Sequence, residues 1–209
     1  MKKLSINEVD ILGKIDYLLL LNGFAIIEDY RESIQECFND LKIFYEETIY
    51  NSKSEEYLGG FCTRNENILK NKKINNTFKS WLSHSLIQAV ANNYLKTNNF
   101  KIDVFQTLDN SETKHSAQKP HFDRIPTLKF LLYLNDIDLE NGPFYLSPGS
   151  HHWVREKFPI PRKNFDSDEL LDNSRNIPDM ILDNLQYVSG KAGQLLIFHT
   201  DCVHHQGIV

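Results

Sequence analysis

The chain has 209 residues, of which 41% are hydrophobic and 24% charged, as in an ordinary globular protein and unlike a disordered or fibrous one. It carries 23 Lys and Arg against 28 Asp and Glu, so the net charge is −5. This acidic balance argues against a general nucleic-acid or anionic-membrane binder. We therefore expect a single domain over residues 1–209 that binds neither nucleic acid nor membrane.

Cysteine usage and hydropathy indicate a cellular setting. Cys37, Cys62 and Cys202 are odd in number and form no CxxC pair, which argues against a disulfide framework or a structural zinc site. The longest apolar run, Tyr17–Ile27, is well short of the roughly 20 residues that a membrane-spanning helix needs. These features predict a cytoplasmic protein.

The first hundred residues are predicted to be mostly helical, with one strand. Apolar residues at helical spacing predict helices over Val9–Leu20, Ile34–Tyr50 and Trp81–Leu95. Phe24–Ile27 is typical of a short buried strand, and the Asn- and Lys-rich stretch Arg64–Asn76 of a solvated loop.

Residues 101–209 have the pattern of a β-rich region. Strands are expected over four segments: Ile102–Leu108, Thr127–Leu134, Phe144–Leu146 and Gly193–His199. Asn141-Gly142-Pro143 predicts a turn, and the polar stretch Arg162–Asn184 contains one further helix. Helices followed by short strands favour an α+β protein whose second half is a double-sheet β-roll.

The segment His121-Phe122-Asp123 carries the main chemical signal. On an extended strand, residues i and i+2 point to the same face, so the imidazole and the carboxylate can bind one metal ion. A third ligand from a distant strand would complete the two-histidine, one-carboxylate arrangement typical of non-haem Fe(II) oxygenases. By itself this spacing is also compatible with an exposed His–Asp hydrogen bond.

Further motifs lie on both sides of this pair. They are Asn22-Gly23-Phe24-Ala25-Ile26-Ile27, Asn141-Gly142-Pro143, Pro148-Gly149-Ser150-His151 and the segment from Gly193 to Gly207. Taken in order, the sequence resembles the phytanoyl-CoA dioxygenase family of Fe(II)/2-oxoglutarate oxygenases. The resemblance implies a double-stranded β-helix (jelly-roll, cupin-like) core over 101–209, flanked by N-terminal helices within 1–100.

The resemblance also implies roles for individual residues. His121 and Asp123 match the first two iron ligands, and His204 matches the third. His205 is the alternative to His204 as the third ligand. Neighbouring strand residues face opposite ways, so only one of the two can point at the metal. His151, His152 and His199 are expected to be structural or to support the ligands. The presence of Asp123 favours hydroxylation, since related halogenases lack this carboxylate.

The co-substrate site departs from the family pattern. Family members hold the far carboxylate of 2-oxoglutarate with an Arg about ten residues after the distal His, whereas this sequence ends at Val209. A shortened chain, another way of holding the co-substrate and a loss of oxygenase function are all open. Lys129 is a substitute anchor for that carboxylate, unless its ammonium simply reaches solvent. Gln106 and Thr127 are candidate contacts to co-substrate or substrate.

The resemblance implies a dioxygenase that uses Fe(II), 2-oxoglutarate and dioxygen to hydroxylate a small molecule, with succinate and carbon dioxide as co-products. One alternative is a non-catalytic metal-binding jelly-roll protein, and another is a metal-dependent oxygenase that needs no 2-oxoglutarate. The substrate pocket is expected beside Tyr57–Asn76 and Arg162–Asn184. Their basic residues could meet an anionic substrate: Arg64, Lys70, Arg162, Lys163 and Arg175. Substrate identity and oligomeric state stay open.

Overall fold

The structure is a computed structural model that describes residues 1–50, 55–57, 60–63, 72–97, 106–110, 119–123, 125–159 and 176–207. Its described strands form three antiparallel sheets of three strands each. The first sheet has the order β1-β8-β5 and consists of Phe24–Ile27, Leu195–His199 and Leu128–Leu132. The second sheet has the order β7-β6-β9 and consists of Gln186–Val188, Phe144–Leu146 and His204–Gln206. The third sheet has the order β2-β3-β4 and consists of Glu55–Tyr57, Gly60–Thr63 and Gln106–Asn110.

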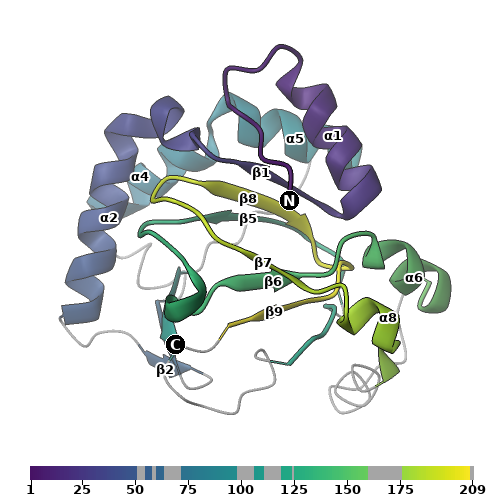
Figure 1. The fold of residues 1–209 in the computed structure, drawn as a ribbon. Coiled ribbons are helices and arrows are strands. Elements are labelled where there is room, and N and C mark those ends of the chain that lie inside the picture. Colours follow the sequence, from purple (N-terminus) through teal and green to yellow (C-terminus); the bar gives the residue numbers. More distant parts are fainter. Residues whose placement is uncertain are drawn as a thin grey trace.

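Helices cover one face of the first sheet, and the second sheet lies against its other face (Figure 1). The covering helices are α1 (Ile11–Asn22), α2 (Gln35–Tyr50), α4 (Lys72–Leu82) and α5 (Ser85–Leu95). A 3₁₀ helix, η1 (Tyr30–Ile34), leads into α2, and another, η3 (Leu139–Asn141), precedes β6. Two short helices, α6 (Ser150–Lys157) and α8 (Asp179–Leu182), lie together at one end of the sheets (Figure 1).

Strand β8 shows how the sequence produces these layers. All five of its residues are buried, as expected for a strand covered on both faces. Leu195 and Ile197 pack in the core beneath the helices. Leu196 and Phe198 pack in a separate core with residues of the second sheet. Because successive strand residues face opposite ways, one run of apolar residues serves both cores.

The predicted α+β organisation, helices first and short strands afterwards, is what the structure shows. The strands Phe24–Ile27 and Phe144–Leu146 match their predicted limits. The strand predicted over Thr127–Leu134 is shorter at both ends, and that over Gly193–His199 begins at Leu195, since Gly193 has the left-handed φ of 98° that suits a turn.

The helix predicted over Trp81–Leu95 is wrong at its start. Trp81 belongs to α4, the chain turns at Ser83 and His84, and a separate helix begins at Ser85. Both helices place apolar residues in the same core. In the sequence, the apolar positions of the two helices therefore look like those of one continuous helix. The predicted loop Arg64–Asn76 is also wrong from Lys72 on, which is helical, while 64–71 lie outside the described residues.

Further differences concern short elements. The strand predicted over Ile102–Leu108 appears as β4, Gln106–Asn110, with 101–105 outside the described residues. Strands β7 and β9 have three residues each, too few to show a periodicity. A helix was predicted within the polar stretch Arg162–Asn184, and the described part of this stretch contains α8.

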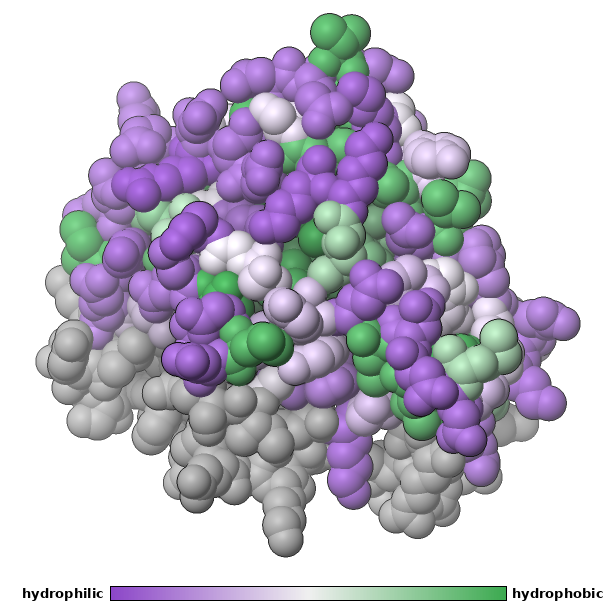
Figure 2. Space-filling model, viewed as in Figure 1, coloured by the Kyte–Doolittle hydropathy of each residue, from purple (hydrophilic) through white to green (hydrophobic). Residues whose placement is uncertain are grey.

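Large apolar side chains are exposed at separate places on several of the described elements. Among the described residues, no helix is long and apolar enough to cross a membrane. On the face that Figure 2 shows, hydrophilic side chains predominate and the apolar ones form small separate groups. Scattered exposed apolar residues of this kind are normal for globular proteins.

Candidate metal centre

His121 and His204 face each other across an antiparallel β-bridge. The N–H of each donates to the carbonyl of the other, at 2.9 Å from His121 and 2.8 Å from His204. The segment that holds His121 therefore extends the second sheet beyond β9. Directly opposed residues of an antiparallel pair point to the same face, and the two imidazole centres are 4.5 Å apart.

The carboxylate of Asp123 lies near both histidines because Asp123 comes two residues after His121 and points to the same face of the extended segment. Its backbone N–H donates to the carbonyl of Thr200 at 2.9 Å, which holds the segment extended. Its Oδ1 lies 3.8 Å from Nε2 of His121 and 3.6 Å from Nε2 of His204. The three residues each offer one ligand atom within 4.8 Å of the others, the spacing of a group that could hold one metal ion.

Both imidazoles are oriented by the same backbone contact. Nδ1 of His121 is 2.8 Å from the carbonyl of Lys119, and Nδ1 of His204 is 2.8 Å from the carbonyl of Cys202. A carbonyl accepts only, so each Nδ1 carries a proton, and in the neutral ring Nε2 is the nitrogen left with a lone pair. Metal-binding histidines are typically fixed in this way by the ring nitrogen that does not bind the metal.

Burial determines the charge state of the third ligand candidate. The His204 side chain is almost fully buried, near the rings of Phe144 and Phe198. Burial, and then the neighbouring His121, lower its pKa to about 3. His204 is therefore neutral at physiological pH, which is the form that binds metals.

Asp123 is ionised for a different reason. Burial would raise the pKa of its carboxyl, but the positive charge near it, including the ammonium of Lys129, outweighs burial and lowers this pKa. Nζ of Lys129 lies 2.8 Å from Oδ2 of Asp123. One carboxylate oxygen thus faces the histidines and the other faces a cation. Lys129, considered in the sequence as an anchor for 2-oxoglutarate, forms an ion pair inside the site.

Two other candidate contacts differ in position. Thr127 is exposed, and its N–H donates to Oγ1 of Thr200 at 2.8 Å. Gln106 lies at the start of β4, which pairs with β3 in the third sheet, and its side chain is not among those described. The basic residues suggested for an anionic substrate, Arg64, Lys70, Arg162, Lys163 and Arg175, lie outside the described residues.

The other histidines near the site are placed away from the three donors. His205 stacks on Tyr145 of the adjacent strand, with ring centres 4.4 Å apart, on the opposite side of β9 from His204. His199 contacts Arg155, and its ring lies 5.1 Å from that of Tyr94. His151 lies in α6, where Nε2 is 3.1 Å from the carbonyl of Leu20. The structure thus brings His204, and not His205, to His121 and Asp123.

The carbonyl partners and the aromatic rings around His204 could not be predicted from the sequence. The partners at Lys119 and Cys202 each precede their histidine by two residues, a spacing that carries no recognisable motif. Phe144 lies within the predicted strand, but its contact with His204 depends on the pairing of β6 with β9.

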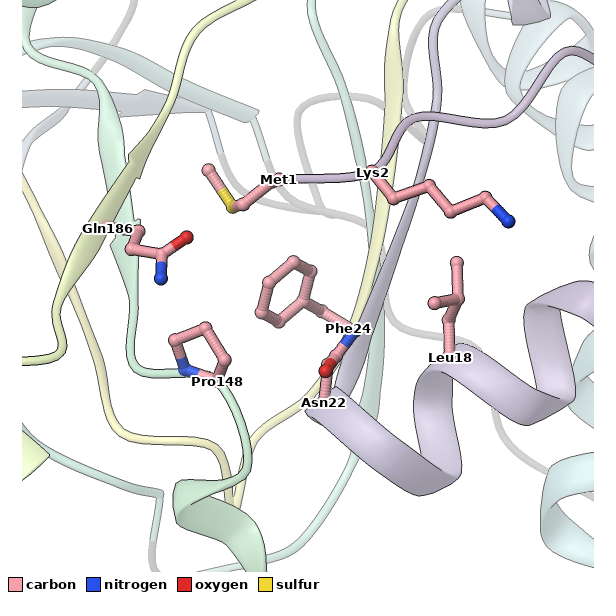
Figure 3. Close-up of a pocket in the computed structure, with 7 residues that line it drawn as sticks. All are labelled: Met1, Lys2, Leu18, Asn22, Phe24, Pro148 and Gln186. Atoms are coloured by element: carbon pink, nitrogen blue, oxygen red, sulfur yellow. The ribbon is translucent and has the colours of Figure 1, made fainter.

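A separate small pocket lies on another part of the molecule (Figure 3). It has a volume of about 190 Å³, and its described lining residues are Met1, Lys2, Leu18, Asn22, Phe24, Pro148 and Gln186. The side chain of Phe24 points into it between Met1 and Pro148. None of the three donors is among these residues, so the pocket is not the metal centre.

Comparison with solved structures defines the class of the fold. The epimerase SnoN, in complex with Fe3+, alpha ketoglutarate and nogalamycin RO, superposes with a TM-score of 0.69 at 17% identity, covering 94% of this chain and 77% of SnoN. The carbocyclase SnoK from nogalamycin biosynthesis gives 0.65 at 14% identity, covering 100% and 81%. AviO1 from Streptomyces viridochromogenes Tue57 gives 0.56 at 14% identity, covering 97% and 90%. The chain thus shares the cupin-like jelly-roll fold of non-haem iron enzymes.

The family follows from the sequence. The model of the phytanoyl-CoA dioxygenase (PhyH) family matches residues 21–207, and the chain belongs to this family. The resemblance seen in the motifs is thereby confirmed, and Fe(II) and 2-oxoglutarate, the expected cofactors, are those of the family. No curated protein sequence matches the chain.

Proposed function

We propose that the protein is an Fe(II)- and 2-oxoglutarate-dependent dioxygenase that hydroxylates a small molecule, with His121, Asp123 and His204 as the iron ligands. The observation that carries the proposal is that His121, His204 and Asp123 each offer one ligand atom within 4.8 Å of the others. Two imidazoles and one carboxylate with open positions are the ligand set of non-haem Fe(II) oxygenases.

The residues present fit such an ion. Metal–nitrogen and metal–oxygen bonds to histidine and carboxylate are about 2.0–2.2 Å long, so donors of one octahedral face lie roughly 3 Å apart. The separations of 3.6 and 3.8 Å between Oδ1 and the two Nε2 atoms are slightly wider and close to this value. Both imidazoles present lone pairs, and the carboxylate is ionised.

The chain's own residues would prepare the centre in two ways. The carbonyls of Lys119 and Cys202 hold the imidazoles with Nε2 toward the ion. Phe144 and Phe198 place aromatic rings beside His204 and limit the access of water there. When bound, iron with 2-oxoglutarate supplies the oxidising chemistry, and the protein supplies geometry and a dry environment.

We favour hydroxylation because the carboxylate of Asp123 lies at the centre and would be one of the iron ligands. A carboxylate that occupies one coordination position leaves no vacancy there for a halide. The structural relatives carry out other reactions, since SnoN is named an epimerase and SnoK a carbocyclase. The first test therefore concerns the cofactors and needs no substrate.

The test is an anaerobic titration with Fe(II) and then 2-oxoglutarate, monitored for the weak visible charge-transfer band of the chelated keto acid. We expect a band in the native protein, its loss in His204→Ala, and its retention in His205→Ala. The second variant is a matched control, since it removes the neighbouring imidazole from the other side of the strand. A band that survives in His204→Ala would overturn the ligand assignment.

The same experiment separates the alternatives. Iron binding without a band would favour an oxygenase that does not use 2-oxoglutarate. A band without any succinate on admission of air, across a panel of substrates, would favour a non-catalytic metal-binding protein. Succinate formation in air that stops in Asp123→Ala supports the proposed enzyme.

A further inference from the structure

Lys129 occupies a position of β5 at which the alternation of the strand predicts an apolar side chain. In β5 it lies directly opposite Phe198 of β8, which faces the core between the two sheets. Leu131, two residues further along the strand, packs in that core. Strand alternation therefore directs the lysine inward, and its side chain is 32% exposed.

The ammonium of Lys129 is held next to the proposed iron ligands without taking a ligand position. Its Nζ lies 2.8 Å from Oδ2 of Asp123 and 5.8 Å from the centre of the Phe198 ring. The other oxygen of the same carboxylate, Oδ1, faces Nε2 of His121 and of His204. A single carboxylate thus lies between the ammonium of Lys129 and the point where the three donors converge.

This placement changes the charge balance of the centre. Two neutral imidazoles, one carboxylate and one divalent ion carry one net positive charge, and Lys129 raises it to two. 2-Oxoglutarate carries two carboxylates and hence two negative charges. With Lys129 included, the loaded centre is neutral, whereas without it a negative charge would be left in a partly buried site. Uncompensated charge in such a site is costly.

We propose that Lys129 provides the positive charge that allows this centre to hold a dianionic co-substrate, acting across Asp123. This inference rests on the proposed function and extends it. It predicts opposite effects on the two ligands, because the ammonium repels a divalent cation and attracts a dianion. A lysine that merely kept Asp123 in place would support both ligands equally.

The experiment measures two affinities by calorimetry, that of Mn(II) for the protein and that of 2-oxoglutarate for the Mn(II)-loaded protein. In Lys129→Met we expect Mn(II) to bind as tightly as in the native protein or more tightly, and 2-oxoglutarate to bind about tenfold or more weakly. Lys129→Gln, which keeps a polar group beside Asp123, should behave in the same way. Lys129→Arg keeps the charge and should stay within about threefold of the native affinity for 2-oxoglutarate.

The matched control is Lys191→Met. Lys191 also forms a lysine–aspartate pair of 2.8 Å, with Asp136, but on the exposed surface. It should change neither affinity, whereas a fall in 2-oxoglutarate affinity there would show that any lost lysine has this effect and would overturn the inference.

Three other results would overturn it. In the first, Lys129→Met binds 2-oxoglutarate within about threefold of the native protein. In the second, Mn(II) and 2-oxoglutarate both weaken, which indicates a purely structural role. In the third, Lys129→Arg loses as much 2-oxoglutarate affinity as Lys129→Met. A native protein that binds Mn(II) but no 2-oxoglutarate would instead overturn the proposed function, and this inference with it.

Discussion

His199 and His204 lie in one short segment of chain and have different surroundings. His199 ends β8 on the side that faces the helices, where it meets Arg155 and the ring of Tyr94. His204 begins β9 on the side that faces the first sheet, where it meets Phe144, Phe198 and the other two donors. The side of the strand, and not the distance along the chain, decides which imidazole is available to a metal.

Arg155 links the helix α6 to the turn between β8 and β9. Its Nε donates to Oδ2 of Asp201 at 3.2 Å, and one of its NH2 groups donates to the hydroxyl of Tyr94 at 2.9 Å. The Asp201 side chain is fully buried, while that of Arg155 is 41% exposed. A buried carboxylate with a hydrogen-bonded guanidinium stabilises the fold chiefly because losing the partner is costly.

At the residue scale we predict that Arg155→Ala destabilises the protein by about 1–3 kcal/mol, less than for a fully buried pair because the guanidinium is partly solvated. The measurement is the free energy of unfolding in urea. Lys157→Ala on the same helix is the control, since Lys157 is exposed, and it should cost less than about 0.5 kcal/mol. Equal stability of the two variants would show that the Arg155 contacts contribute nothing.

Gly23 determines how the first helix connects to the first strand. It has a left-handed φ of 84°, and its N–H donates to the carbonyl of Leu19 at 3.1 Å, which ends α1. Its own carbonyl accepts from the N–H of His199 at 2.9 Å, which begins the pairing of β1 with β8. A Cβ at this position would lie 2.8 Å from Nδ1 of His151. The glycine is therefore required both by the backbone and by the close approach of α6.

At the element scale we predict that Gly23→Ala is more destabilising than Gly149→Ala. Both glycines have a left-handed φ, which costs an alanine about 1–2 kcal/mol. Among the described residues, a Cβ at Gly149 would have only the carbonyl of Leu21 nearby, at 3.8 Å, whereas one at Gly23 adds a steric clash worth about 1–3 kcal/mol. Urea unfolding of both variants measures the difference, and equal losses would show that His151 moves aside freely.

Across the molecule, burial keeps several histidines neutral. The pKa is lowered, mainly by burial, for five histidines of the described residues: His84, His151, His199, His204 and His205. In the unfolded chain each would titrate near pH 6.5. Below that pH the unfolded state binds more protons than the folded state, so the free energy of unfolding falls as the pH falls.

At the scale of the whole molecule we predict a loss of more than about 1 kcal/mol of stability between pH 7 and pH 5.5, since each differential proton contributes about 1.4 kcal/mol per pH unit. The lowered carboxyl pKa of Asp123 adds a loss only below about pH 4, as the pH falls toward the folded value. Urea midpoints at pH 7, 6.25 and 5.5 provide the measurement, with a chelator present to exclude metal binding. A midpoint that is constant or rises on acidification would contradict it.

Part of this architecture follows from the sequence because the causes are local. The strands Phe24–Ile27 and Phe144–Leu146 match their predicted limits because Gly23 and the turn at Asn141–Pro143 end the preceding segments. The i, i+2 spacing of His121 and Asp123 puts both on one face, and strand alternation separates His204 from His205. Alternation by itself leaves His204 and His205 as alternatives, and the choice of His204 as the third donor came from the resemblance to the family motif.

Only the tertiary structure decided the surroundings of those donors. The break between α4 and α5 was hidden because the apolar residues of both helices continue one helical pattern in the sequence. The three-residue strands β7 and β9 form by pairing with β6. The ion pair of Lys129 with Asp123 depends on the path of the chain between them. That path is held by Thr200, which bonds to the backbone of both Asp123 and Thr127 from more than seventy residues away. Such long-range hydrogen bonds are set by sheet register, which no local sequence pattern specifies.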